Sequence, residues 1–320
     1  MPSGRNRRSG ASLQVSGAPD KVAQVHVGGR GFLIATVDFW PPDPRLKRYV
    51  SGYHRYTLVR DEGDTDSAFR DVFFPAWSNI RFTFDAEPWG VRVGRRAFDP
   101  VPACAFFGPT SHAGYVSAGS GILVGVGLTP AGWARLHGGT VALWADRIAP
   151  LDQVFPVLAA ARDGVRDAQD PAAFFDAVLL GLVERSPPES PAIDAIMSRL
   201  LDPAIDRVEG LADGLGLSAR QIGRLTRTCF GFTPKLLLRR ARFLRAFDAI
   251  RTLDRGLWTG AIRDAGYWDG SHFLRDCHLF LDMALGDFMT MERPINRISM
   301  RRRDEVLGAP MQSLARPDGA

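Results

Sequence analysis

The sequence has few of the residues that build a disulfide framework or a metal site. Its three cysteines, Cys104, Cys229 and Cys277, are odd in number, far apart and without CxxC spacing. Such cysteines are typical of a reducing compartment, so we expect free thiols and a cytoplasmic location. The six histidines show no metal-ligand spacing, and we expect neither a metal nor a cofactor.

Long apolar runs are also missing. No stretch reaches the roughly 18 uncharged apolar residues of a membrane span, so no membrane partner is expected. The first residues, MPSGRNRRSGASLQVSGAPD, are basic, but no apolar segment follows them, which argues against a secretion signal. We expect residues 1–29 to form a disordered basic arm.

One long window lacks acidic residues. The chain has 35 Asp and Glu against 40 Lys and Arg, yet residues 214–247 contain no acid at all. A run of one sign indicates either a polyanionic partner or a solvated basic face, and charge alone leaves both open. The basic residues of this window are Arg220, Arg224, Arg227, Lys235, Arg239, Arg240, Arg242 and Arg245.

The chain of 320 residues divides into a β-rich part and a helical part, which predicts an α+β multidomain protein. Runs such as FLIATVDFW, IRFTF and GILVGVGL lie between Gly, Pro and Asp in residues 30–155 and predict a small β-barrel or sandwich with flanking helices. Residues 156–192 are expected to be a helical linker that ends in the proline-rich SPPESPA. Residues 193–293 are expected to be all-helical, and residues 294–320 to be a flexible tail.

The helical part contains an internal repeat. LADGLGLSARQIGRLTRTCFGFTP and AIRDAGYWDGSHFLRDCHLFLDMA, about 50 residues apart, each predict a short helix, a turn and a second helix. Gly216 and Gly266 are turn glycines that accept positive φ, and Ser218 and Asp269 are N-cap residues. This is the helix-turn-helix arrangement, and PKLLLRRARFLRAFDAIR has the length of a helix connecting the two copies.

Both halves, in this order and at this separation, resemble the DNA-binding domain of the AraC/XylS family of bacterial transcription regulators. The family pattern G-[FY]-x-[DS]-x-S-H-F-x-R is matched by GYWDGSHFLR. The resemblance covers about residues 193–291. It departs from the family at Thr226 and Cys277, where Phe is usual, and we expect Phe230, Phe232 and Phe280 to supply the missing bulk.

The resemblance implies a cytoplasmic, nucleoid-associated transcription regulator that binds double-stranded DNA. Two recognition helices would enter successive major grooves and read a bipartite site. The N-terminal β-barrel is similar to an uncharacterised domain of some members. It is expected to sense a small effector or to pair protomers as a homodimer, and the second copy could contact RNA polymerase.

The resemblance also implies roles for individual side chains. Arg and Gln on the first turns of a recognition helix contact base edges, and basic residues farther along contact phosphates. For Gln221, capping of its own helix is an equal alternative. The expected base contacts are Arg220, Gln221, Arg224, Ser271, His272 and Arg275, and the expected phosphate contacts are Arg227, Lys235 and His278.

The residues of the second copy also allow a catalytic interpretation. Asp269, Ser271 and His272 lie within one helical turn, but a catalytic cluster needs a further group and a pocket, and neither is visible. We expect no catalytic residue and no enzyme. The alternatives are a constitutive DNA-binding protein whose barrel only dimerises, and an enzyme in the N-terminal barrel.

Overall fold

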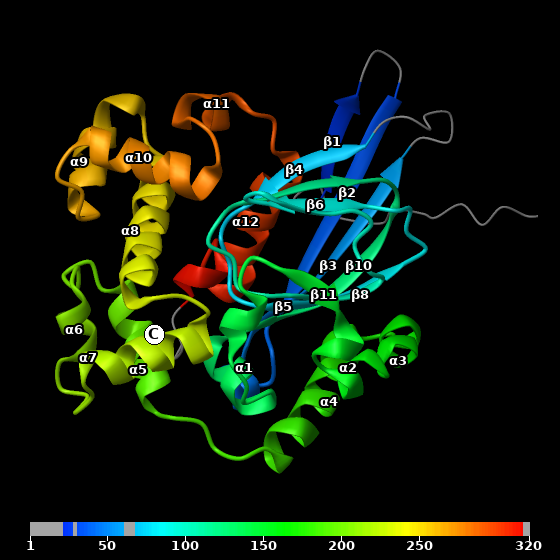
Figure 1. The fold of residues 1–320 in the computed structure, drawn as a ribbon. Helices are drawn as coiled ribbons and strands as arrows, with labels where there is room; N and C mark the ends of the chain where they lie inside the picture. Colours follow the sequence, from blue (N-terminus) through cyan, green and yellow to red (C-terminus); the bar gives the residue numbers. More distant parts are fainter. Residues whose placement is uncertain (1–21, 28–30, 61–67, 316–320) are drawn as a thin grey trace, which may run out of the picture.

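Two antiparallel sheets fill the first half of the computed structural model, which describes residues 22–27, 31–60 and 68–315 (Figure 1). The larger sheet has the strand order β1-β2-β3-β10-β5-β8-β11, and the smaller has the order β4-β9-β6-β7. The strands are β1 (Val22–Val27), β2 (Gly31–Trp40), β3 (Val50–Arg60), β4 (Phe69–Phe73), β5 (Asn79–Phe84), β6 (Gly90–Val93), β7 (Arg96–Phe98), β8 (Cys104–Phe107), β9 (Gly114–Ala118), β10 (Gly121–Leu128) and β11 (Ile148–Pro150).

The larger sheet is open rather than closed. β1 and β11 lie at its opposite edges, whereas a barrel requires the first and last strands to bond to each other. The α+β class and the β-rich first part are therefore confirmed, and of the expected barrel or sandwich the closed barrel is not formed. The runs FLIATVDFW, IRFTF and GILVGVGL form β2, β5 and β10 as predicted.

Helices cover one face of the larger sheet (Figure 1). Residues 156–185, expected as part of a linker, belong to this layer, because α4 buries Phe175 and Leu179 against Phe82 of β5. Only residues 186–190 lack regular structure before the next helix turns begin. The short and long helices of this region are η3 (Pro44–Leu46), α1 (Pro130–Leu136), η4 (Val141–Trp144), η5 (Leu151–Gln153), α2 (Pro156–Ala159), α3 (Arg162–Asp167) and α4 (Pro171–Arg185).

The smaller sheet covers part of the opposite face. Trp89 and Val91 of the smaller sheet pack against Ala105 and Phe107 of β8. We call the two sheets with α1–α4 the sheet domain. The inner faces of β2 and β3 extend beyond the smaller sheet and need another cover.

Residues 193–291 are helical, as predicted, and form the helical domain. Its central element is α8, which packs against the helices of both repeats. The elements are α5 (Ala192–Leu201), α6 (Val208–Ala212), α7 (Ala219–Leu225), η6 (Thr226–Phe230), α8 (Pro234–Ile250), η7 (Arg255–Leu257), α9 (Trp258–Asp264), α10 (Gly270–Leu281) and α11 (Leu285–Thr290).

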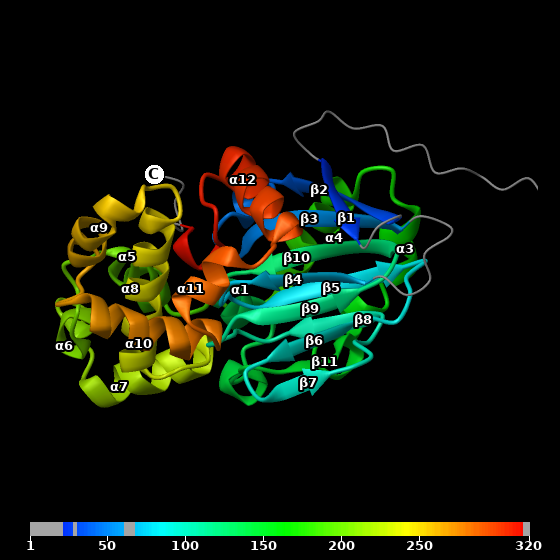
Figure 2. The ribbon, with the colours of Figure 1, turned by 90° about the horizontal axis from the view of Figure 1, so that it is seen from above.

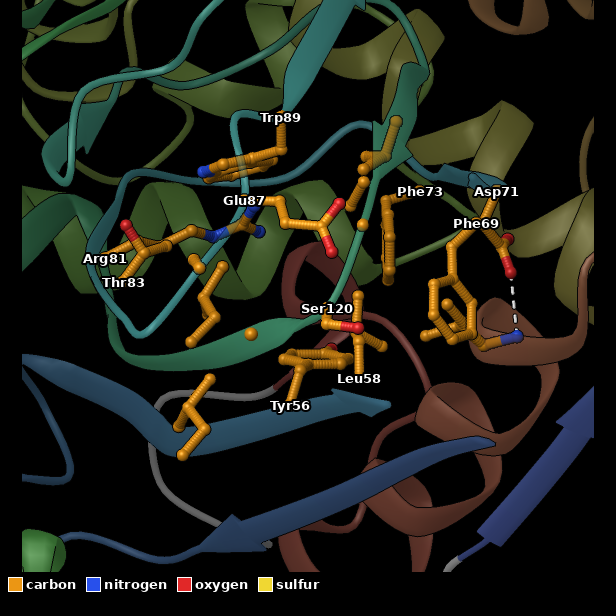
Figure 3. Close-up of a pocket in the computed structure, with 18 residues that line it drawn as sticks. Tyr56, Leu58, Phe69, Asp71, Phe73, Arg81, Thr83, Glu87, Trp89 and Ser120 are labelled. Carbon is orange, nitrogen blue, oxygen red and sulfur yellow. Dashed lines mark hydrogen bonds between the residues drawn. The ribbon is translucent and has the colours of Figure 1, made fainter. Parts of the chain in front are cut away.

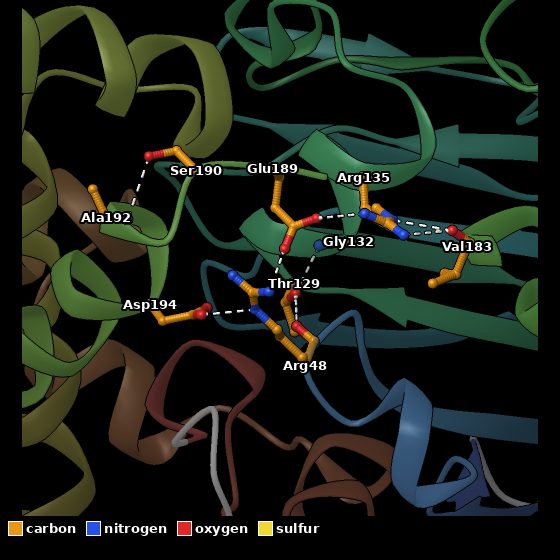
Figure 4. A network of polar contacts seen from close by, with 9 residues as sticks. All are labelled: Arg48, Thr129, Gly132, Arg135, Val183, Glu189, Ser190, Ala192 and Asp194. Atoms are coloured by element: carbon orange, nitrogen blue, oxygen red, sulfur yellow. Dashed lines mark hydrogen bonds and ion pairs between the residues drawn. The ribbon is translucent and has the colours of Figure 1, made fainter. Parts of the chain in front are cut away.

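Ion pairs fix the proline-rich connection between the sheet domain and the helical domain (Figure 4). The side chain of Glu189 is only 2% exposed and pairs with Arg48 at 2.5 Å and with Arg135 at 3.6 Å. Arg48 also pairs with Asp194 of α5 at 2.7 Å. The connection is therefore fixed to the sheet domain on one side and to α5 on the other.

The two domains share a buried interface. Arg240 of α8 donates to the carbonyl oxygen of Thr110 at 2.8 Å, and its guanidinium lies 3.9 Å from the ring centroid of Trp77. The N–H of Ala113 donates to the carbonyl oxygen of Phe280 at 2.7 Å. Burial lowers the pKa of Arg240 to about 9, which leaves it charged at neutral pH.

The C-terminal segment is not a flexible tail, and this prediction is wrong for residues 294–315. α12 (Pro294–Leu307) and η8 (Gln312–Leu314) return to the sheet domain, and we call residues 294–315 the strap. Ile295 and Ile298 pack on Val37 and Phe39 of β2, which the smaller sheet leaves uncovered (Figure 2). Apolar burial and a set of long-range polar contacts therefore hold a segment whose composition is basic.

The N-terminus of α12 is capped from a distant strand. Asp71 of β4 accepts from the N–H groups of Ile295 at 2.7 Å and Asn296 at 3.1 Å. Its other carboxylate oxygen accepts from the N–H of Val72 at 2.7 Å. Burial outweighs these bonds and raises the pKa of Asp71 to about 6.

The basic arm was expected to cover residues 1–29, but Val22–Val27 of that range form β1, an edge strand that pairs with β2. Extension of the sheet by one strand satisfies the outer backbone groups of β2. Residues 1–21 and 28–29 of the expected arm lie outside the described residues.

Replacement of Asp71 tests the attachment of the strap. Asp71→Ala leaves two buried N–H groups without an acceptor, so we expect the free energy of unfolding to fall by about 2 kcal/mol. Asp71→Asn keeps an acceptor oxygen and should cost less. Because the folded pKa of about 6 exceeds the reference value of 3.8, the native state binds more protons between these values, and stability falls as pH rises through this window.

Urea unfolding across the window measures this effect. Between pH 4 and 7 the wild type should lose about 2–3 kcal/mol of stability relative to Asp71→Asn, which has no group titrating there. A pH-independent difference between the two proteins would contradict a protonated Asp71 in the native state.

Candidate nucleic-acid interface

The first helix-turn-helix is formed by α6 and α7. Gly214 and Gly216 have φ values of 69° and 63°, which reverse the chain between the two helices. Ser218 caps α7, and Gln221 completes a capping box by accepting from the N–H of Ser218 at 2.8 Å. The side-chain oxygen of Gln221 is therefore used at the helix end, which favours capping over base contact for this residue.

The exposed face of α7 is basic. Arg220 and Arg224 lie on its first two turns, and both side chains are exposed. Arg227 follows in the π-helical turn η6, where it donates to the carbonyl oxygen of Gly223 at 3.2 Å. Lys235 is exposed at the start of α8. The opposite face is apolar, with Ile222 fully buried against α8.

The second helix-turn-helix is formed by α9 and α10. Gly266 has a φ of 94° in the turn, and Asp269 caps α10 by accepting from the N–H of His272 at 2.7 Å. Asp269 and His272 are thus joined through a helix cap, not through a side-chain pair of a catalytic kind. Ser271 and Arg275 are exposed on the first turns of α10.

His272 faces inward more than expected. Its side chain is half-buried, its ring lies 4.9 Å from that of Tyr267, and its Nε2 is 3.3 Å from the Arg242 guanidinium. Burial and then the charge of Arg242 lower the pKa of His272. His272 is therefore neutral at physiological pH. His278, two turns along the helix, is exposed.

A buried carboxylate positions α10 on α8. Asp276 has no exposed surface and accepts from Arg239 Nε of α8 and, at 2.6 Å, from the hydroxyl of Tyr267 in the turn. Arg242 lies 3.9 Å from the same carboxylate. One acidic residue thus ties together the connecting helix, the turn and the recognition helix.

The basic window therefore divides into two sets. Arg239 and Arg242 face Asp276, Arg240 is buried in the domain interface, and Arg245 donates to the carbonyl oxygen of Leu200 at 2.7 Å. These arginines stabilise the helical domain and its contact with the sheet domain. The exposed set is Arg220, Arg224, Arg227 and Lys235, which all belong to the first copy.

Thr226 and Cys277 occupy the two positions where Phe is usual in the family. Thr226 and Cys277 are both fully buried. Phe230 and Phe232 lie in the core around the first copy, and Phe280 lies in the core around the second. Each of these aromatics is at most 7% exposed, so all three are core residues, and the replacement of bulk by them stays a prediction.

Both recognition helices lie on the same side of the helical domain, with α5 and α9 behind them (Figure 2). Their buried faces meet one rigid helix, because Ile222 of α7 and Phe273 of α10 belong to cores that α8 contributes to. The arrangement therefore presents two exposed helix N-termini from one support.

Trp268 is an exposed residue that sequence analysis missed. It lies in the turn before the cap of α10 and is 89% exposed, whereas its neighbour Tyr267 is 2% exposed. Spacing alone does not separate the two aromatics, because the turn has no helical or strand period.

In the described residues, no group of three or more His, Cys, Asp or Glu could hold a metal ion. No helix in the described ranges is long and apolar enough to cross a membrane.

Residues 211–291 match the family model described as "Helix-turn-helix domain". They form a helix-turn-helix domain of the AraC type, and the protein is a DNA-binding transcription regulator. The family of this domain consists of regulators, not enzymes. A comparison with curated proteins found none that matches the chain.

Solved structures with some likeness to this chain include ToxT from Vibrio cholerae, at 7% identity and a TM-score of 0.42 over 80% of this chain and 97% of that one. ToxT from strain SCE256, bound to an unsaturated fatty acid, shows 10% identity and a TM-score of 0.40 over 83% and 98% of the two chains. The AraC-like transcriptional activator CuxR shows 13% identity and a TM-score of 0.31 over 71% and 87%.

Replacement of Asp276 tests how α10 is positioned. Asp276→Ala leaves Arg239 and the Tyr267 hydroxyl without a partner, and we expect a loss of about 2–4 kcal/mol in unfolding free energy. DNA affinity should fall with it. Asp248→Ala, which removes a half-exposed ion pair with Arg251 in the same domain, should cost at most about 1 kcal/mol. Equal losses from the two variants in urea unfolding would refute a special role of Asp276.

Proposed function

We propose that this regulator reads a bipartite duplex site, with α7 and α10 in successive major grooves. The observation that carries the proposal is the placement of both helix N-termini, exposed and on one side of α8. A recognition helix presents its first turns to base edges, so both copies have the required geometry. The connection through one helix makes a single chain sufficient for both half-sites.

Within this site the side chains have different roles. Arg220, Arg224 and Arg275 are proposed as base contacts, since Arg pairs well with guanine in the major groove. Ser271 is proposed as a further base contact. Gln221 and His272 lie at the helix starts but are held by Ser218 and Arg242, so a base contact through either would require its side chain to leave that partner.

Phosphate contacts are proposed for Arg227, Lys235 and His278. The first copy carries the exposed cations at both base and phosphate positions, whereas Arg275 is the exposed arginine of α10. The first copy should therefore dominate the electrostatic part of affinity and its salt dependence. The second copy would add sequence specificity or a contact to RNA polymerase.

The sheet domain is proposed to sense a small effector, and pairing of protomers is the alternative role for it. An apolar pocket between the two sheets, lined by aromatic and aliphatic side chains, supports the effector reading. An enzymatic role has no support among the described residues, where no Ser or Cys side chain is hydrogen-bonded to a histidine. The proposed location is the cytoplasm, at the nucleoid.

Selection of genomic DNA fragments by the purified protein tests the proposal. The wild type should enrich one site with two half-sites about one helical turn apart. The double variant Arg224→Ala, Arg275→Ala should lose this enrichment, because each base contact contributes about 1–3 kcal/mol. Arg297→Ala, which removes an exposed charge on α12, is the matched control and should select the same site.

The salt dependence of binding tests the division between the copies. Removal of a phosphate contact at Arg227 or Lys235 should reduce the slope of log affinity against log salt by about 0.9 per contact. His278→Ala should change it less. A site without two half-sites, or a salt slope changed as much by His278→Ala as by Lys235→Ala, would contradict the proposed arrangement.

A further inference from the structure

A second chamber lies between the larger sheet and the strap. Its walls come from β3 and β5 on one side and from α12 and η8 on the other, so it forms where distant parts of the chain meet. Tyr56, Phe73 and Arg81 line both this chamber and the apolar pocket between the sheets, and the two spaces are therefore neighbours.

Glycines of β10 make room for the chamber. Gly125 lies between His54 of β3 and Arg81 of β5 in the strand register, and a Cβ at this position would come within 2.4 Å of His54 Nε2. Gly127, two residues on, faces the same way, and a Cβ there would meet Ser51 Oγ at 2.4 Å and Gln312 Nε2 at 2.9 Å. Glycine inside a strand marks a place where other groups come close to the backbone, here the ring of His54 and the Gln312 side chain of the strap.

The chamber is positively charged and has no acidic lining. Arg81 and Arg303 line it, and none of its lining residues is Asp or Glu. Arg303 is 7% exposed and donates to the carbonyl oxygens of Ala309 at 2.6 Å and Ser51 at 3.0 Å. Burial, and then the charges of Arg81 and Arg303, lower the pKa of His54 well below its usual value, so His54 adds no charge at neutral pH.

Arg81 lacks a counter-charge. Its Nε is buried without a hydrogen-bond partner, and no carboxylate pairs with it among the residues the structure describes. The ring of Phe107 has its centroid 4.2 Å from the guanidinium carbon. Figure 3 shows the side chain reaching into the space between Trp89 and Tyr56. The side chain is half-buried, so water stabilises its charge only in part and no described protein group replaces the rest.

Two further polar atoms in the chamber lack partners. His54 Nε2 and Asn296 Oδ1 are buried and make no hydrogen bond to the described residues. Ordered water could satisfy these two atoms. Water cannot neutralise the Arg81 guanidinium, so the chamber remains suited to an anion.

We propose that this chamber binds the anionic group of an effector, with Arg81 as its counter-charge, while the adjoining apolar pocket takes the apolar body of the same molecule. The ligand class is thus a small organic monoanion, such as an aromatic or aliphatic carboxylate. The inference rests on the proposed effector role of the sheet domain and names the chemistry of its ligand.

The position of the chamber also assigns the element that senses the ligand. Three residues of α12 line the chamber: Asn296, Ser299 and Arg303. Only one helix, α11, separates α12 from the second helix-turn-helix. Asp71, which caps α12, lines the neighbouring apolar pocket. Occupancy of the chamber therefore changes the packing of the strap. By linkage, the ligand and DNA alter each other's affinity by the same factor.

The test uses matched pairs of an acid and its amide on the full chain without DNA: benzoate with benzamide, and octanoate with octanamide. Thermal unfolding and calorimetry should show binding of at least one carboxylate, about ten-fold or more tighter than its amide, because hydrogen bonds to a charged group are the stronger ones. Arg81→Met should abolish this preference. The midpoint of unfolding of the free variant should change little, because the substitution removes a half-buried charge that has no protein partner among the described residues.

Arg162→Met is the matched control. Arg162 lies 4.9 Å over the ring of Phe84 and donates to the carbonyl oxygen of Thr83, but it lines neither space. This variant should keep the carboxylate preference. Arg81→Gln serves as a second variant if Arg81→Met does not fold.

Three outcomes would overturn the proposal. Carboxylates and amides could bind equally, the Arg81 variants could keep the preference, or the wild type could respond to no acid of the panel. A destabilised Arg81 variant that still prefers the acid would assign Arg81 to packing on Phe107. Since DNA is absent from these measurements, they can fail while selection of a bipartite site succeeds, and the reverse also holds.

Discussion

The bond between Asp71 and the first turn of α12 is the contact on which the arrangement of the whole chain depends. It brings residue 71 and residues 295–296 together in a buried position, and it sets the strap over the inner faces of β2 and β3. Without that cover, two strands of the larger sheet would expose an apolar surface to water. The helical domain is consequently anchored at both ends, by Glu189 before it and by α12 after it.

Charge has two separate uses in the helical domain. Buried or half-buried arginines meet Asp276, the Thr110 carbonyl and the Leu200 carbonyl, and so fix α8 against α10, the sheet domain and α5. The exposed cations of α7 remain available for a polyanion. The one-sign run in the sequence is therefore a mixture of structural and binding residues, which total charge could not separate because it carries no information about burial.

Local signals in the sequence predicted most of the helical domain. Caps such as Ser218 and Asp269, and the turn glycines beside them, act within a few residues and are readable from spacing. The strap escaped prediction because its stabilising contacts are remote: Arg303 bonds to Ser51, and Ile295 bonds to Asp71. β3 was missed because VSGYHRYTLVR mixes polar residues into a strand whose inner face lines the chamber. The Asp276 cluster joins residues from α8, the turn and α10, and no short pattern encodes it.

After the helical domain, the chain returns to the sheet domain. The sheet domain is therefore built from residues before 186 and after 293, and the helical domain is an insertion within it. A ribosome releases the N-terminal strands first, then the whole DNA-reading unit, and only last the helix that covers β2 and β3. The sheet domain therefore completes its core only after α12 has left the ribosome. Until then its apolar strands are open to chaperones, and a protein truncated before α12 would carry intact helix-turn-helix copies beside an incomplete sheet domain.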